Sequence, residues 1–404
     1  MTHSKRKNEI VKPRHRIIFS ILRLLVGPIL KYKYKYNFEY NRKLKKSGPY
    51  VIISNHTIAL DPLYLALAFP FPIYFVASKE IFNLGLKSKI INYLVSPISK
   101  NKVDVDTKTI KNMLKVRDEK GSIGIYPEGN LTYNGQTSKM PNLAKLIKLL
   151  KMPLIIYKTS GLYLQNPRWA LTKTKGEAYG SIIKIYTADE VSSFDNETLN
   201  KILSFMLFND ANYEAINLEL PIVPLTSGFE RFMFICPACK KIGTIRSVRD
   251  RVFCLDCEYL VSYDKYGFLG NIPLKKVDDS IKEDYLLYLS KIDENFEILQ
   301  GVCRVKLSLD KKKEDLGDFN FNLTKGRLEL GSIELDIKYM FCFNNDLKIS
   351  IQGKNKLLIN NDKSTYLIIF SNDISPYLFL LTYQIQSLKE KNNEYSIKLS
   401  DIGL

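Results

Sequence analysis

Histidine and tryptophan are scarce in this chain of 404 residues, which has three of the former and one of the latter. Because histidine is the side chain whose ordinary pKa lies closest to neutral pH, a histidine-based site has few candidates here. The sequence also lacks an apolar run of about 20 residues, the length that a helix needs to cross a bilayer. The apolar run at residues 17–30 is shorter and contains Arg23 and Pro28. No small-residue cleavage site follows it, so we expect neither a secretory signal peptide nor a membrane-spanning helix.

Acidic residues are outnumbered, with 42 Asp and Glu against 60 Lys and Arg, which gives a formal net charge of +18. Residues 1–50 hold fourteen of the cationic residues and only two acidic ones. A basic end on a nearly balanced body indicates an anionic partner, either nucleic acid or the acidic headgroups of a membrane. The apolar run with its basic flank favours a helix lying in the membrane interface, although a helix packed on the core has a similar composition. We therefore expect a peripheral or interfacially anchored protein on the cytoplasmic face of the cell membrane.

The chain has only six cysteines, and four of them follow the pattern C-x2-C-x14-C-x2-C. Two such pairs are typical of a four-cysteine zinc ribbon in a reducing compartment rather than of a disulfide framework. Four protein ligands leave no open coordination position, so the expected cofactor is one structural Zn²⁺. Basic residues close to the cysteines leave nucleic-acid binding open as an alternative. The ligands are Cys236, Cys239, Cys254 and Cys257, and the basic residues are Lys240, Lys241, Arg246, Arg249 and Arg251.

Strand-like and helix-like segments alternate through the first half of the chain, which predicts an α/β fold with a mixed central sheet flanked by helices. Turn-separated β runs from residue 300, closed by a helix at 375–389, predict a small mostly-β C-terminal domain. Their order suggests a fold like that of a pleckstrin-homology domain. The expected organisation is a basic arm and interfacial helix at 1–44, the α/β domain at 45–228, the zinc ribbon at 229–270, a helical linker at 271–299 and the β-rich domain at 300–404.

One histidine lies between a strand and a helix. The apolar strand at 50–54 precedes His56, and Asp61-Pro62 begins the next helix. His3 and His15 fall in the basic arm, so His56 is the histidine expected in the folded body. A carboxylate on one imidazole nitrogen fixes the tautomer and leaves the other nitrogen free to accept a proton. The same spacing also fits an Asp that caps a helix beside an unrelated His.

A second segment of interest follows another predicted strand. Residues 126–130, Tyr-Pro-Glu-Gly-Asn, combine Pro and Gly, which favour a tight turn at the sheet edge. Such a turn would hold Glu128 and several backbone N–H groups in place. Taken alone, the segment is also what an ordinary turn looks like.

Together these residues resemble the glycerolipid acyltransferase superfamily, best known from 1-acylglycerol-3-phosphate acyltransferase. Asn55, His56 and Asp61 match its signature NHxxxxD, and residues 126–129 match most of its signature FPEGTR. Between and after them, residues 76–80, 97–100 and 152–156 match further family blocks in the right order. Residues 161–163 and 167–170 resemble a bacterial branch. The resemblance covers residues 45–225.

The resemblance implies a one-step acyl transfer in phospholipid biosynthesis without a catalytic cofactor. His56 would take the proton from an acceptor hydroxyl while that oxygen attacks a thioester or acyl-phosphate carbonyl, and Asp61 would hold the ring. The implied donor is acyl-CoA, acyl-ACP or an acyl phosphate. The implied acceptor is a lysophospholipid or glycerol phosphate, first of all 1-acyl-sn-glycerol-3-phosphate. The residues expected to bind substrate are Asn55, Lys100, Tyr126, Pro127, Glu128, Gly129, Asn130 and Arg168.

Two departures from the family pattern concern the acceptor. Leu131 stands where the family has an arginine, and Lys100 replaces another arginine, which keeps the charge but loses the bidentate fork. Arg168 is the expected substitute. Two alternatives remain at this point: a zinc-ribbon protein that binds nucleic acid without catalysis, and a catalytically inactive, lipid-sensing family member.

Overall fold

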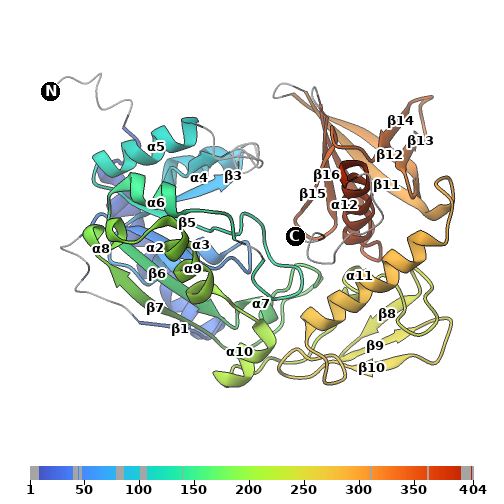
Figure 1. Cartoon of the computed structure of the whole chain (residues 1–404), viewed down its shortest axis with the longest axis horizontal. Coiled ribbons are helices and arrows are strands. Elements are labelled where there is room, and N and C mark those ends of the chain that lie inside the picture. The colour runs from blue at the N-terminus through green and yellow to red at the C-terminus, as the bar shows by residue number, and fades with distance from the viewer. Residues whose placement is uncertain are drawn as a thin grey trace. The chain divides into compact units, whose positions relative to one another are not determined.

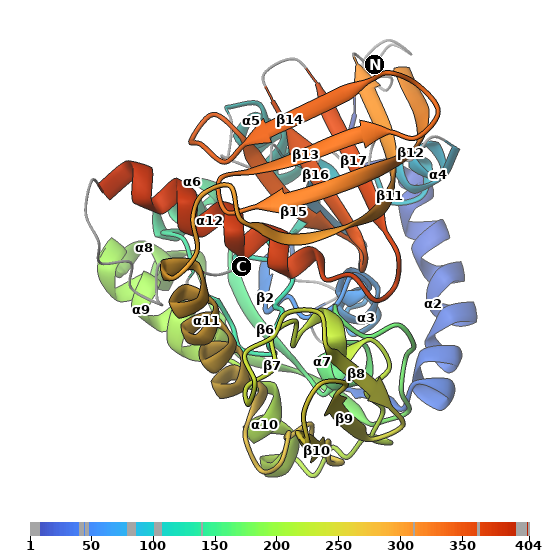
Figure 2. The same cartoon turned by 90° about the vertical axis from the view of Figure 1, so that its right-hand side faces the viewer.

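The computed structural model describes residues 9–39, 44, 48–78, 86–100, 107–138, 140–309, 312–361, 364–392 and 402 (Figures 1 and 2). The chain forms two compact units. The first comprises residues 1–165 and 175–221, and the second comprises residues 166–174 and 222–404. The predicted zinc ribbon and β-rich region thus fall in one unit, whereas the finer boundaries at 270 and 299 stay predictions.

The first unit is built on a seven-stranded mixed sheet with the strand order β1-β7-β6-β2-β5-β3-β4, as the sequence predicts. Strands β6, β2, β5, β3 and β4 run parallel, whereas β7 is antiparallel to β6 and parallel to β1. The strands are β1 (Tyr36–Phe38), β2 (Val51–Ser54), β3 (Ile73–Ser78), β4 (Ile98–Lys100), β5 (Ser122–Ile125), β6 (Leu154–Ser160) and β7 (Ala178–Tyr186).

Helices cover both faces of this sheet, which is why the central strands are apolar throughout rather than alternating. On β2, Val51 and Ile53 pack with α5, α6 and α9, whereas Ile52 joins α3 on the other face. The helices of this unit are α2 (Pro13–Lys33), α3 (Asp61–Leu67), α4 (Leu86–Val95), α5 (Thr107–Asp118), α6 (Ala144–Leu150), α7 (Leu162–Gln165), α8 (Ala188–Ser193), α9 (Asn196–Leu207) and α10 (Ala211–Asn217). None of the helices among the described residues is long and apolar enough to cross a membrane.

The N-terminal segment packs against the sheet of the first unit around His15, although the sequence predicts a basic arm there. His15 is buried in α2, and its Nδ1 lies 3.0 Å from the hydroxyl of Tyr74. Burial, with help from the charges of Arg14 and Lys12, lowers the pKa of His15. The expectation that His56 is the one histidine of the folded body is therefore wrong. His3 lies outside the described residues.

After residue 222, the second unit continues with the ribbon. A 3₁₀ turn at Phe229–Arg231 leads into a three-stranded antiparallel sheet with the order β10-β9-β8. Its strands are β8 (Ile245–Val248), β9 (Arg251–Cys254) and β10 (Leu260–Ser262), and α11 (Leu274–Ser290) follows. This helix lies within the predicted helical linker at 271–299 but ends at Ser290, and residues 297–299 already belong to the next strand.

The C-terminal region is an antiparallel seven-stranded sheet with one closing helix, α12 (Pro376–Asn392), which confirms the mostly-β prediction. Its strand order is β14-β13-β12-β11-β17-β16-β15. The sheet is curled: β14 and β17 are not neighbours in it, yet the rings of Phe341 and Tyr366 pack with centroids 5.0 Å apart. The likeness to a pleckstrin-homology domain stays a prediction. The strands are β11 (Glu297–Leu309), β12 (Lys312–Thr324), β13 (Arg327–Ser332), β14 (Lys338–Cys342), β15 (Lys348–Gln352), β16 (Lys356–Asn360) and β17 (Thr365–Phe370).

Candidate active site and metal centre

The candidate site lies at the carboxyl edge of the first sheet, where β2 and β5 end side by side. His56 follows β2 by two residues, and Tyr126 follows β5 directly. Because β2 and β5 are parallel and paired, the loops that leave them meet at one edge. The two predicted segments are thereby brought together, and the backbone N–H of His56 donates to Oε1 of Glu128 at 3.3 Å.

His56 and Asp61 form the predicted pair. Nδ1 of His56 lies 3.0 Å from Oδ2 of Asp61, which is fully buried. The same oxygen accepts the backbone N–H groups of Thr57 at 2.5 Å and Ile58 at 2.9 Å. A buried carboxylate held in this way requires a donor at Nδ1, so Nε2 is the nitrogen without the proton. The His56 side chain remains 19% exposed, which leaves it accessible to a substrate.

The geometry decides between the two interpretations of Asp61. A capping carboxylate accepts N–H groups from the first turn of its own helix, two or three positions further on. Asp61 instead accepts the N–H groups of Thr57 and Ile58, which precede α3, and it also contacts the imidazole. Its carboxylate therefore holds the loop at residues 56–58 in place rather than capping α3.

Aromatic rings hold the imidazole in place. The ring of Tyr126 stacks on His56 with centroids 4.4 Å apart and an interplanar angle of 24°. Phe75 in turn stacks on Tyr126, with the two ring centroids 5.8 Å apart. The Tyr126 hydroxyl is buried and has no hydrogen-bond partner among the described residues. Burial, with the negative charge of Asp61 close by, raises the pKa of Tyr126 well above its usual value. Tyr126 thus fixes the orientation of the histidine ring.

Glu128 has an unusual protonation state. Burial raises its pKa to about 8, and the charge of Asp61 acts in the same direction, whereas the N–H of His56 opposes it. The neutral acid therefore predominates at pH 7. No cation is among the groups that shift this pKa, in line with Leu131 standing where the family pattern has an arginine. A neutral Glu128 reduces the negative charge that an anionic substrate would meet.

Asn55, expected to bind substrate, forms hydrogen bonds with Thr159 through both atoms of its amide group. The side chain is buried, its Nδ2 donates to the carbonyl of Thr159 at 2.8 Å, and its Oδ1 accepts the N–H of Thr159 at 2.9 Å. Asn55 therefore ties the end of β2 to the end of β6 and positions the neighbouring histidine. Thr159 could not be predicted from the sequence, because its role depends on pairing between strands about a hundred residues apart.

The other expected residues of this unit occupy the same edge at different depths. Pro127 is buried, whereas Gly129 and Asn130 are exposed. The φ of Gly129 is +71°, a conformation that explains the glycine at this turn. Lys100 ends β4, three strands from β2 in the sheet, or about 14 Å at ~4.8 Å per strand.

Arg168, the expected substitute for the missing arginine, lies outside the first unit. It belongs to the second compact unit, where its guanidinium donates to the carbonyl oxygens of Ile351 and Gly353. The neighbouring Trp169 is fully buried against Phe229, with ring centroids 4.8 Å apart. Arg168 therefore serves the packing of the second unit, and its predicted contact with an acceptor phosphate has no support in the described contacts.

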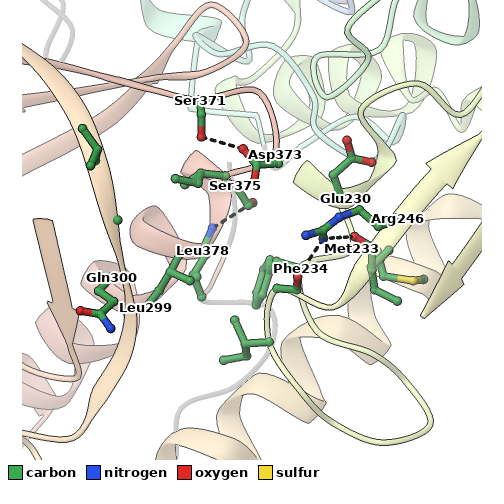
Figure 3. A pocket seen from close by; sticks show the side chains of 16 residues that line it. Glu230, Met233, Phe234, Arg246, Leu299, Gln300, Ser371, Asp373, Ser375 and Leu378 are labelled. Atoms are coloured by element: carbon green, nitrogen blue, oxygen red, sulfur yellow. Dashed lines mark hydrogen bonds between the residues drawn. The ribbon is translucent and has the colours of Figure 1, made fainter. Parts of the chain in front are cut away.

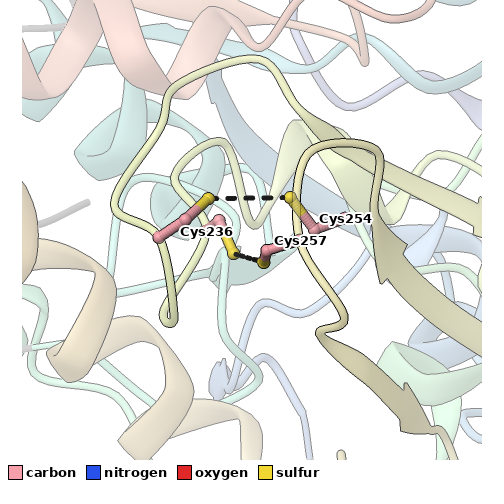
Figure 4. Close-up of side chains that lie close together, drawn as sticks. Cys236, Cys254 and Cys257 are labelled. Atoms are coloured by element: carbon pink, nitrogen blue, oxygen red, sulfur yellow. Dashed lines mark hydrogen bonds between the residues drawn. The ribbon is translucent and has the colours of Figure 1, made fainter.

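The four predicted cysteines come together in the ribbon (Figure 4). Their sulfur atoms all lie within 4.8 Å of one another, with Cys236 and Cys257 at 3.7 Å and Cys239 and Cys254 at 3.8 Å. A tetrahedral ion with metal–sulfur bonds of about 2.3 Å sets its sulfur ligands about 3.8 Å apart. The cluster thus has the size and ligand set to hold one metal ion. Of the other two cysteines, Cys303 is buried as expected and Cys342 is exposed.

Comparison with known proteins bears on the first unit. Residues 35–157 match the family model described as Acyltransferase. A 1-acyl-sn-glycerol-3-phosphate acyltransferase of Borreliella burgdorferi is 22% identical over 169 residues, which cover 40% of this chain and 66% of that protein, slightly less than two thirds of its length. The crystal structure of the 1-acyl-sn-glycerophosphate (LPA) acyltransferase PlsC from Thermotoga maritima is 15% identical, covering 52% of this chain and 84% of that one, with a TM-score of 0.42. An apo structure of an activated truncation of Vav1 is 9% identical, covering 28% and 38%, with a TM-score of 0.18. Both TM-scores are below 0.5, which is too low to establish a common fold.

Proposed function

Since residues 35–157 belong to the glycerolipid acyltransferase superfamily, we propose that this acyltransferase moves a fatty acyl group onto a hydroxyl of a lysophospholipid or glycerol phosphate. The favoured acceptor is 1-acyl-sn-glycerol-3-phosphate, and the donor is an acyl thioester (acyl-CoA or acyl-ACP) or an acyl phosphate. The observation that carries the proposal is the His56–Asp61 pair, because Asp61 engages Nδ1 and the ring stays 19% exposed beside the 126–129 turn.

The proposed step needs no covalent enzyme intermediate. Nε2 of His56 takes the proton of the acceptor hydroxyl as that oxygen forms a bond to the acyl carbonyl carbon. Asp61 stabilises the imidazolium that results, because its buried charge lies 3.0 Å from Nδ1. The carbon–sulfur or carbon–oxygen bond to the donor then breaks, and the imidazolium returns its proton to the departing thiolate or phosphate.

The acceptor's anionic end is proposed to lie over the 126–130 turn, with Lys100 as the nearest expected cation on the same sheet edge. The neutral form of Glu128 supports this arrangement, since a second carboxylate charge beside Asp61 would repel a phosphate. Lysine lacks the bidentate fork of arginine, and Leu131 is apolar. The site should therefore bind phosphate less tightly and with less geometric specificity than a site with two arginines.

The proposal is tested by a radiolabelled acyl-transfer assay with the full chain in lipid vesicles. The acceptors would be 1-acyl-sn-glycerol-3-phosphate, two other lysophospholipids and glycerol 3-phosphate, each offered with acyl-CoA, acyl-ACP and acyl phosphate. We expect the highest kcat/KM with 1-acyl-sn-glycerol-3-phosphate. Preference for another lysolipid would change the acceptor, and no transfer to any of them would favour the inactive, lipid-sensing alternative.

A membrane surface is the proposed site of action, at the cytoplasmic face of the cell membrane. One face of α2 exposes an apolar stripe with the spacing of helical turns, and the exposed fractions are 74% for Leu24 and 62% for Leu25. Basic residues flank the stripe, and none of the first-turn residues is acidic. This combination suits a helix that lies in the interface of an anionic bilayer. The stripe comprises Ile17, Ile21, Leu24, Leu25 and Ile29.

Replacement of both Leu24 and Leu25 by Glu is expected to weaken binding to vesicles of phosphatidylcholine and phosphatidylglycerol by at least about tenfold, since burying each leucine contributes about 1.5–3 kcal/mol. Co-sedimentation at several salt concentrations measures this. Leu335→Glu, at a 56% exposed position in the second unit, is the matched control and should bind like the unaltered protein. Equal vesicle binding by the double variant and the control would refute the role of the stripe.

We further propose that the cysteine cluster holds one structural Zn²⁺ and has no part in transfer. The alternative of a nucleic-acid-binding ribbon loses some support because two of its five basic residues form ion pairs within the protein. Lys240 pairs with Asp284 and Lys241 with Asp256, both at 2.7 Å. A nucleic-acid complex would have to break these ion pairs, and a filter-binding assay at low salt that finds no affinity would exclude it.

A further inference from the structure

The second unit contains a cavity of about 430 Å³ that the proposed transfer does not use (Figure 3). Its walls come from segments far apart in the chain: residues 230–234 and 242–246 of the ribbon, residues 299–302 of β11, and residues 371–378 at the start of α12. This volume lies within the range of about 300–1,000 Å³ that small-molecule sites occupy, and such sites are common where two modules meet.

The floor of the cavity is apolar and firmly held. Met233, Phe234, Ile245 and Leu378 line it, and each is at most 3% exposed. Ser375 also lines the cavity. Its hydroxyl donates to the main-chain carbonyl of Arg231, in the 230–234 wall, at 2.6 Å. The two walls are therefore joined, so the cavity is preformed rather than opened by a ligand.

Two carboxylates lie among the lining residues, Glu230 and Asp373. Oε2 of Glu230 accepts the hydroxyl of Ser247 at 2.6 Å, and Oδ1 of Asp373 accepts the hydroxyl of Ser371 at 2.6 Å. Each carboxylate retains further lone pairs, since an ionised carboxyl group accepts about four hydrogen bonds. Within the described part of the chain, neither forms an ion pair, although the whole protein carries a net charge of +18.

The lining contains one cation, Arg246, against two carboxylates, so its formal net charge is −1. Nη1 of Arg246 donates to the carbonyl oxygens of Gly243 at 2.8 Å and Ile245 at 2.7 Å, bonds that fix the ribbon wall. Figure 3 shows this guanidinium next to the chain that carries Phe234, with Glu230 close to it and Asp373 on the opposite wall. The lining therefore combines a net negative charge with an apolar floor.

We propose that this cavity binds a small amphiphile with a positively charged amine head and an aliphatic tail. The ammonium group donates its hydrogen bonds to Glu230 and Asp373, and the tail covers Met233 and Phe234. An anionic amphiphile such as a free fatty acid is disfavoured, because its carboxylate would meet two like charges.

The proposal also gives the ribbon a role beyond its own stability. Phe234 lies two residues before Cys236, and the lining residues Ile242 and Gly243 follow Cys239 closely. The N–H of Gly243 donates to the carbonyl of Phe234 at 2.9 Å, so the first cysteine knuckle is continuous with the wall of the cavity. Ligand binding should therefore depend on an intact metal site.

The test compares three probes of equal chain length, n-octylammonium, n-octanoate and n-octanol, with the metal-loaded full chain. Titration calorimetry, with saturation-transfer NMR for weak binding, gives the affinities. We expect n-octylammonium to bind at least about tenfold more tightly than n-octanoate. The double variant Glu230→Gln with Asp373→Asn should lose that preference. Equal or tighter binding of n-octanoate, or no detectable binding of n-octylammonium, would overturn the proposal.

A pair of matched variants locates the binding. Val302 lines the cavity and is 50% exposed, whereas Ile333 is 52% exposed on a turn outside it. Val302→Trp is expected to fill the mouth and reduce n-octylammonium binding at least tenfold, while Ile333→Trp should leave it unchanged. If the two variants bind alike, the probe occupies another apolar surface and the assignment of this cavity is wrong.

Discussion

Replacement of His56 by Ala is expected to reduce kcat for acyl transfer by about 10²–10⁴-fold, the contribution of a positioned general base. The reason is geometric. Asp61 holds Nδ1 at 3.0 Å, and Tyr126 stacks on the ring, so Nε2 is presented in one orientation and one tautomer. Without the imidazole, the acceptor hydroxyl has no base to take its proton. Initial rates at saturating donor and acceptor measure the effect.

His15→Asn is the control for this experiment, because His15 is the other histidine that the structure describes and contacts Tyr74 outside the site. It should keep kcat within a few fold of that of the unaltered protein. Both variants should still bind vesicles, and their melting temperatures show whether a loss reflects unfolding. Unchanged turnover by a folded His56→Ala variant would exclude His56 as the base.

Removal of the metal is expected to unfold the ribbon, and Cys254→Ser should have the same effect. A structural zinc site contributes an apparent binding free energy of about 10–16 kcal/mol in small zinc modules, which is comparable to the total stability of a typical domain. Cys236 and Cys254 are buried next to apolar residues of the second unit, so losing the cluster should disturb that unit as well. Metal analysis should find one zinc per chain, and near-UV circular dichroism should change on chelation.

Cys342→Ser is the matched control, since Cys342 is exposed and outside the cluster. It should retain a full equivalent of metal and the same melting temperature. If Cys254→Ser also retains a full equivalent, or if chelation leaves the spectrum unchanged, the cluster is not a structural metal site. A bound metal other than zinc would keep the structural role and correct the identity of the ion.

The central sheet was predictable because its strands are buried on both faces and therefore appear as short apolar runs between turn residues. The N-terminal region was less predictable. The segment expected to be a basic arm and interfacial helix at 1–44 also contributes a strand, because α2 ends at Lys33 and Tyr36–Phe38 pair with β7. This pairing joins residues about 140 positions apart, which a short window of sequence does not reveal.

The candidate site was predictable as a set of residues but not as a set of roles. Spacing and resemblance brought His56, Asp61 and Glu128 to one place. Whether Asp61 caps its helix or holds the imidazole depends on how the loop folds, which the sequence does not specify. Asn55 was expected to bind substrate from its match to the family signature, and Arg168 as a substitute for a missing arginine; in the structure both side chains donate to main-chain carbonyls.

The segment at residues 166–174 has a consequence for shortened forms of the protein. The chain passes from the first unit to the second, returns at residue 175, and leaves again at residue 222. Within that segment, Trp169 is fully buried against Phe229, which follows residue 222. A protein that ended at residue 221 would therefore keep Trp169 but lose the aromatic side chain that covers it, so the first unit cannot be separated from the second by a single cut without exposing this indole.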